Sequence, residues 1–182
     1  AYDVLGPTVR DGAIVHDHLS GIEDLPQGWR DEQAPGHYRL HPQPDDPRLF
    51  DHTVGPHSWK RFLHPATESQ VRVIRSPDGA LRFESSAPTP TPMALIGVRA
   101  CELAAMAIQD RVLAGAAHPD RAFEARRAAL FIIGVQCARA GGTCFCADMG
   151  AGPRAEAGYD LALTEIMEPG GAISWQDRKS VV

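Results

Sequence analysis

Two uninterrupted apolar runs lie in the second half of the chain, separated by a segment with helical periodicity. The runs are Met93–Val98 and Leu130–Val135, and such runs are typical of strands buried on both faces. Residues 102–113 and the segment that follows Asp120 predict two helices between them. Strands joined by a helical crossover are normally parallel neighbours in one sheet. The sequence therefore predicts a βααβ core.

The first of these helices has residues at helical spacing that indicate which face it buries. The positions i, i+3, i+4, i+7 and i+11 define one face, and they are occupied by Cys101, Ala104, Ala105, Ile108 and Val112. We expect this face to pack on the sheet. The second helix has Asp120 as its expected N-cap.

The first 89 residues are rich in turn formers and poor in long helical patterns. Short apolar stretches flank Asp11-Gly12, and others flank 76–79, which predicts two hairpins. A short helix is expected near Trp59. The proline-rich run 87–92 reads as an extended connector. We therefore predict a mixed α/β fold, with a β-rich part at 1–89 followed by the cysteine-bearing βααβ part at 90–176.

Composition narrows the class of protein. The chain has 182 residues, 43% of them hydrophobic, and a formal net charge of −5 without a basic cluster. Nucleic acid is therefore not expected as a partner. No apolar run approaches the roughly 20 residues that a transmembrane helix needs. Neither is a signal peptide visible, and we expect a cytoplasmic protein.

Four cysteines, all between residues 101 and 146, carry the functional hypothesis. Cys101 and Cys137 each follow one of the buried runs, and parallel strands end at the same edge of a sheet. Cys144 and Cys146 lie on the loop that leaves the second run and can fold back over that edge, where open α/β sheets bind ligands. The four thiols are therefore candidate ligands of one metal centre.

Other residues near the cysteines suit such a centre. Arg99 precedes Cys101 by two positions, and a guanidinium favours thiolate. Gly141, Gly142 and Gly150 permit the positive φ angles of a tightly wrapped loop and expose N–H groups to cluster sulfur. We expect these four residues to surround the cofactor.

The cysteine spacing leaves alternatives open. It matches neither the bacterial ferredoxin run nor a common zinc knuckle, and buried free thiols are a further interpretation. Four thiolates suit a 4Fe-4S cluster or structural zinc equally well. The chain has no Ser-His-Asp pattern, no P-loop and no GxGxxG motif after a strand. A self-contained hydrolase or dehydrogenase is therefore not supported.

Several segments resemble one known family. GVRACELAA at 97–105 resembles the GVRxCDLxA segment of the sulfhydrogenase beta-subunit family, which includes the A-type subunits of anaerobic sulfite reductases and other 4Fe-4S dicluster proteins. CFCADMGAGP at 144–153 is similar to its CFCxSMGxGP loop, and GYDLALTE at 158–165 to its GYDLxLTE strand. YDVLGP at 2–7 and VGPHSWK at 54–60 also resemble its N-terminal region. The resemblance covers nearly all of 1–176, with Asp148 in place of the expected Ser.

The resemblance implies a non-catalytic electron-transfer subunit of a hydrogenase-, sulfhydrogenase- or sulfite-reductase-type complex. Its partners would be other redox subunits, one of them bearing FAD, and a ferredoxin-like domain would follow this portion. Two rival hypotheses stay open: a partner-docking module built on structural zinc, and a flavin-binding redox domain without a cluster.

The last six residues, 177–182, do not fit the rest of the chain. Their sequence, DRKSVV, equals the translation of a widely used sequencing adapter. We therefore expect a non-native tail on a truncated fragment.

Overall fold

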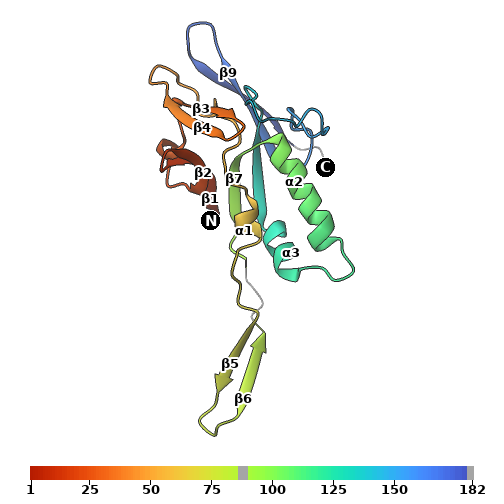
Figure 1. Cartoon of the computed structure of the whole chain (residues 1–182). Coiled ribbons are helices and arrows are strands. Elements are labelled where there is room, and N and C mark those ends of the chain that lie inside the picture. Colours follow the sequence, from red (N-terminus) through yellow and green to blue (C-terminus); the bar gives the residue numbers. More distant parts are fainter. Residues whose placement is uncertain (86–89, 180–182) are drawn as a thin grey trace.

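A six-stranded mixed sheet organises the molecule (Figure 1). The computed structural model describes residues 1–85 and 90–179. The strand order is β10-β9-β8-β7-β1-β2, with these bounds: β1 Asp3–Arg10, β2 Ala13–His18, β7 Met93–Val98, β8 Leu130–Val135, β9 Leu161–Met167 and β10 Ile173–Lys179. The predicted mixed α/β class, with a β-rich N-terminal part, is confirmed.

Parallel pairing is confined to the middle of the sheet. Strands β1, β7, β8 and β9 run parallel to one another, and Leu95 of β7 lies opposite Ile132 of β8. The two edge strands, β2 and β10, are antiparallel to their neighbours. The β7–β8 crossover consists of α2 (Ala100–Gln109), a π-helical turn η2 (Asp110–Ala114) and α3 (Arg121–Ala128). The βααβ prediction is confirmed.

Local signals explain where these elements begin. Asp120 caps α3, and its carboxylate accepts hydrogen bonds from the N–H groups of Ala122 and Phe123, each at 3.0 Å. The β1–β2 turn places Asp11 and Gly12 at φ angles of 47° and 74°, as expected of a tight hairpin turn.

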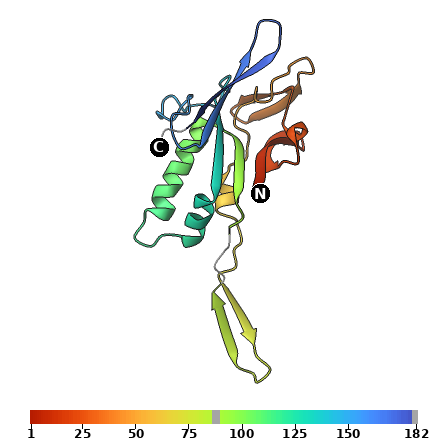
Figure 2. The same cartoon turned by 180° about the vertical axis from the view of Figure 1, so that it is seen from behind.

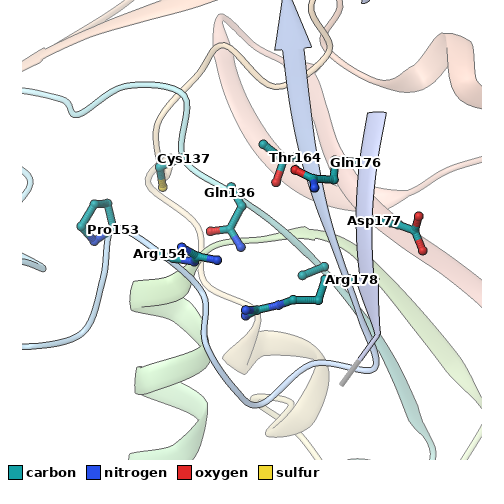
Figure 3. A pocket seen from close by; sticks show the side chains of 9 residues that line it. Gln136, Cys137, Pro153, Arg154, Thr164, Gln176, Asp177 and Arg178 are labelled. Carbon is teal, nitrogen blue, oxygen red and sulfur yellow. The ribbon is translucent and has the colours of Figure 1, made fainter. Parts of the chain in front are cut away.

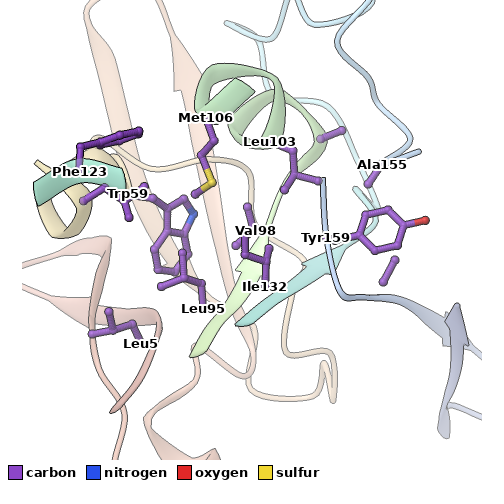
Figure 4. Packing of buried hydrophobic residues seen from close by; sticks show 13 residues of the cluster. Leu5, Trp59, Leu95, Val98, Leu103, Met106, Phe123, Ile132, Ala155 and Tyr159 are labelled. Atoms are coloured by element: carbon purple, nitrogen blue, oxygen red, sulfur yellow. The ribbon is translucent and has the colours of Figure 1, made fainter. Parts of the chain in front are cut away.

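The main core lies between the helices and one face of the sheet (Figure 4). Leu5, Leu95 and Ile132 from the strands meet Met106 and Phe123 from the helices. The short helix α1 (Lys60–Leu63) closes this layer, with Trp59 buried at its start.

The expected buried face of α2 is wrong. Ile108 and Val112 are 52% and 63% exposed, whereas Leu103 and Met106 are buried. Two of the five residues on the predicted face, Ala104 and Ala105, are small and gain little from burial. The helix is rotated so that its two bulkiest side chains near the sheet, Leu103 and Met106, enter the core.

The opposite face of the sheet is covered only in part. A second cluster formed by Leu25, Phe50 and Val135 covers its carboxyl-terminal half. This layer comes from the segment after β2, which contains η1 (Ile22–Asp24) and the hairpin of β3 (Trp29–Ala34) and β4 (His37–Pro42).

A second hairpin, β5 (Val71–Arg75) and β6 (Leu81–Ser85), extends away from the body as an arm (Figures 1 and 2). Its turn is the predicted 76–79 segment. The proline-rich connector predicted at 87–92 lies partly outside the described residues.

The structure bears on two boundaries that the sequence predicts, one at 89/90 and one at the start of the 177–182 tail. Strands from both sides of the 89/90 boundary share the six-stranded sheet, because β1 pairs with β7. Residues 177–179 of the expected tail continue β10, and 180–182 lie outside the described residues. Within the described ranges, no helix is both long and apolar enough to cross a membrane.

The buried face of α2 gives a direct stability test. Met106→Ala is expected to lower the free energy of unfolding by about 2–4 kcal/mol, because it leaves a cavity in the core. Ile108→Ala, two positions along the same helix, should lower it by less than about 1 kcal/mol. Urea denaturation followed by circular dichroism measures both. Equal losses would contradict the observed orientation of the helix.

Candidate metal centre

The cysteines lie at the carboxyl-terminal edge of the parallel strands. Cys101 is in the first turn of α2, directly after β7, and Cys137 follows the end of β8 by two residues. Because β7 and β8 are adjacent and parallel, this edge is shared by both residues. The topology thus places Cys101 and Cys137 at one edge of the sheet, as the sequence predicts.

The loop that carries the other two thiols folds back toward the start of α2. A Cβ built on Gly152 would lie 3.4 Å from the Sγ of Cys146 and 3.1 Å from the Cβ of Ala100. Cys146 is therefore next to the residue that precedes Cys101. Cys144 is exposed, whereas the other three cysteines are partly buried, and none of the four forms a disulfide.

The pKa shifts of the cysteines reflect the proximity of the four thiols. Burial, then the Glu102 carboxylate, and then the other three thiols raise the pKa of Cys101 to about 11. Burial also raises the pKa of Cys137, and the Arg99 guanidinium opposes that rise. Four thiolates would repel one another here, so a bound cation is what would favour their joint deprotonation.

The thiols are grouped but are not arranged as a finished ligand set. In residues 1–85 and 90–179, no three His, Cys, Asp or Glu side chains have positions suited to holding one metal ion. The donor chemistry nevertheless fits a thiolate-ligated centre: four sulfur atoms at one edge, with a backbone donor among them. The N–H of Gly141 donates to the Sγ of Cys144 at 3.3 Å.

Arg99 lies beside this edge, where its guanidinium binds backbone carbonyls. Its position in the sequence did not indicate this role. It is 2% exposed, and its guanidinium donates to the carbonyls of Phe50 and His52, at 2.9 and 3.0 Å, and of Gln136 at 2.9 Å. It also lies over the ring of Phe50. Arg99 therefore joins the ends of β7 and β8 to the segment that covers the sheet.

The structure explains the glycines at 141, 142 and 150 in different ways. Gly150 has a φ of 60°, as expected. Gly142 is required by close approach instead, because a Cβ there would lie 2.4 Å from the carbonyl oxygen of Gln33. A Cβ on Gly141 would come within 3.1 Å of the Thr53 hydroxyl. Two of the glycines thus allow the loop to pack against β3 and its neighbours.

A buried ion pair holds the base of the same loop. Arg139 donates to the carboxylate of Asp31, which also accepts the backbone N–H of Thr53 at 2.8 Å. Asp31 is 3% exposed, so these partners supply the hydrogen bonds that water cannot. The sequence did not predict this pair, because the two residues are 108 positions apart and no local pattern joins them.

Cavities flank the cysteine edge. One, about 480 Å³, is bordered by Gln136, Cys137 and Arg154 and by residues of β9 and β10 (Figure 3). A second, about 210 Å³, lies between α1 and α2 beside Cys101, with His57 and Trp59 in its wall. Access to the thiols therefore exists from two sides.

No protein-family model, curated protein or solved structure matches the chain. The family resemblance of the motifs therefore stays a prediction.

Two buried titratable groups, His16 and Glu102, lie next to each other near Cys101. The Nε2 of His16 is 3.7 Å from the Oε1 of Glu102, and the His16 ring stacks on Trp59 with 3.8 Å between centroids. Burial, reinforced by cationic neighbours, lowers the pKa of His16 to about 4. Burial raises the pKa of Glu102 to about 7, although the N–H of Arg99 donates to its carboxylate at 2.9 Å. The fold thus favours the neutral form of both groups.

The opposite shifts of His16 and Glu102 predict a specific pH dependence. Unfolding lets His16 bind a proton between pH 4 and 6.5, so its contribution to stability is present above pH 6.5 and is lost as the pH falls. The folded state retains the Glu102 proton between pH 4.5 and 7, so that contribution is present below pH 4.5 and is lost as the pH rises.

Glu102→Gln removes the second contribution and keeps the acceptor for the Arg99 N–H. Relative to the native chain, the variant should gain up to about 3 kcal/mol of stability as the pH rises from 4.5 to 7. Urea denaturation across this range measures the difference, and parallel curves for the two proteins would contradict the buried, neutral Glu102.

The contacts of Arg99 predict a large loss when they are removed. Arg99→Leu leaves several buried carbonyls without a donor and should lower the free energy of unfolding by about 3–5 kcal/mol. Arg111→Leu, on the exposed part of the helical crossover, is the matched control and should change it by about 0.5 kcal/mol or less. Chemical denaturation compares the two, and a small loss at Arg99 would contradict its bridging role.

Proposed function

We propose that the chain is an iron-sulfur electron-transfer module of a hydrogenase-, sulfhydrogenase- or sulfite-reductase-type complex. Its 4Fe-4S cluster would be ligated by Cys101, Cys137, Cys144 and Cys146. The observation that carries the proposal is the gathering of all four thiols at one edge of the sheet, two after parallel strands and two on the loop that returns to α2. The motifs shared with the sulfhydrogenase beta-subunit family support iron over zinc.

The surroundings of the thiols suit one-electron transfer. Three cysteines are partly buried, whereas Cys144 is exposed, so one side of a cluster would approach the surface. Phe145 and Met149, on the same loop, expose 66% and 68% of their surface. Exposed apolar side chains around a redox centre are suited to contact with another protein, and we propose a second redox subunit, with FAD on such a partner.

The chain's own residues would position and tune the cluster. Arg99 fixes the ends of β7 and β8 and favours thiolate at Cys137. The N–H of Gly141 donates to sulfur, which influences the reduction potential. The cluster would supply one-electron chemistry when bound, and the module would need no proton-transfer catalyst of its own. A reducing, cytoplasmic setting is part of the proposal.

Anaerobic reconstitution with iron and sulfide tests the function. We expect a brown protein, bleached by dithionite, with about four irons and four sulfides per chain. Replacing any one of Cys101, Cys137, Cys144 and Cys146 by Ser should lower the iron content and change the electron paramagnetic resonance spectrum of the reduced protein. Asp148→Ser is the matched control, because it introduces Ser into the same loop and leaves all four thiols.

The alternatives give distinct results. A colourless protein with stoichiometric zinc would support the structural zinc module, and a yellow protein with extractable flavin would support the flavin-binding domain. Either result, without iron uptake, would refute the proposed cluster.

A further inference from the structure

The cavity between α1 and α2 is lined by buried polar atoms that have no hydrogen-bond partner. It measures about 210 Å³ and lies beside Cys101. Among the described residues, the Nε1 of Trp59, the Oε1 of Glu102 and the Oε1 of Gln109 are buried without a hydrogen bond, and all three residues line this cavity. Trp59 is 1% exposed and Glu102 is 9% exposed. Because buried polar groups in proteins are nearly always hydrogen-bonded, this inner part of the cavity is suited to a polar ligand.

The unpartnered atoms include both a donor and acceptors. The indole N–H of Trp59 can only donate, whereas the amide oxygen of Gln109 accepts. Burial raises the pKa of Glu102, and the Trp59 side chain is one of the groups that oppose this rise, so the two side chains lie close together. They do not reach hydrogen-bond geometry with each other. A hydroxyl group both accepts and donates, so a ligand hydroxyl can pair with the Trp59 N–H and with one of the two oxygens.

Apolar side chains form the rest of the cavity wall. Val54, Ala105 and Met106 line it, and Met106 lies next to Trp59 under α2 (Figure 4). The cavity is smaller than the roughly 300–1,000 Å³ of sites that hold drug-sized molecules. The wall and the volume therefore suit a short aliphatic ligand.

The mouth of the cavity is cationic. His57 and Lys60 line both the cavity and an adjoining open depression, which Arg61 also lines. In the part of the chain that the structure describes, none of these three pairs with a carboxylate, whereas the neighbouring His64 lies 3.9 Å from Asp120. Arg61 donates to the Nδ1 of His57 at 3.3 Å, which leaves the other ring nitrogen of His57 as a donor. These uncompensated groups favour an anion at the mouth.

We propose that this cavity binds a small hydroxycarboxylate, with its hydroxyl at the inner end beside Trp59 and its carboxylate at the mouth beside Lys60. A carboxylate without a hydroxyl would leave the inner atoms unpaired, and a neutral alcohol would leave the cations at the mouth unpaired. The site is built by α1 and α2, so it goes beyond the proposed cluster and does not depend on it. Since the cavity borders Cys101, the bound ligand would lie against the cysteine edge.

Nuclear magnetic resonance titration of the full, isotope-labelled and reduced chain tests the proposal. The probes are γ-hydroxybutyrate, butyrate and γ-hydroxybutyramide, and the readout is the indole N–H signal of Trp59, assigned with Trp59→Phe. We expect γ-hydroxybutyrate to bind with a Kd in the millimolar range, as is typical of so few atoms. Butyrate, which lacks the hydroxyl, should bind about tenfold more weakly or worse. The amide, which lacks the charge, should bind about threefold to tenfold more weakly.

Two variants, each with a matched control, locate the site. Ala105→Leu adds a side chain to the cavity wall and should weaken γ-hydroxybutyrate about tenfold or more. Ala107→Leu, at an exposed position of the same helix that does not line this cavity, should leave binding unchanged. Lys60→Gln should weaken γ-hydroxybutyrate about threefold to tenfold and leave the amide unaffected, whereas Arg111→Gln should alter neither.

Several results would overturn the proposal. If no probe shifts the Trp59 signal, the cavity holds water alone. Equal binding of butyrate and γ-hydroxybutyrate would refute the inner hydroxyl site, and equal binding of the amide would refute the anionic mouth. Binding that survives both Ala105→Leu and Lys60→Gln would place the probe elsewhere. Circular dichroism establishes that the variants are folded. Chains with and without iron are titrated alike, so a failed cluster reconstitution would not affect this test.

Discussion

The buried guanidinium of Arg99 is the interaction on which the architecture of the cysteine edge depends. It lies between the ends of two parallel strands and a third segment from the first half of the chain, and it donates to carbonyls after β8 and in that third segment. Those carbonyls belong to irregular backbone that has no sheet partner to satisfy it. Without a donor they would be buried and unpaired, at a cost of about 1–3 kcal/mol each. Arg99 thus allows irregular backbone to converge where the thiols lie.

The sheet and its crossover were predictable because the signals are local. Apolar runs of strand length, an Asp cap and tight-turn residues each act over a few positions. The strand-end positions of Cys101 and Cys137 followed from the handedness and parallel direction of such crossovers. The orientation of α2 was not predictable from spacing alone. Its apolar residues surround much of the helix, and the choice of face depends on which side chains, Leu103 and Met106, fill the space over the sheet.

The long-range polar contacts were beyond the reach of sequence patterns. Arg139 and Asp31 are distant in the chain, and so are His16 and Glu102. Nothing in the local sequence around any of these residues indicates its partner. The need for glycine at position 142 was equally hard to predict. A carbonyl from β3 occupies the space that a side chain on Gly142 would fill. Tertiary packing, not turn geometry, determines that position.

The arm and the cysteines lie at opposite ends of the same strands. Strands of six residues separate these ends by roughly 20 Å. A protein that bound the arm would therefore leave the cysteine edge accessible, and both surfaces could be occupied at the same time.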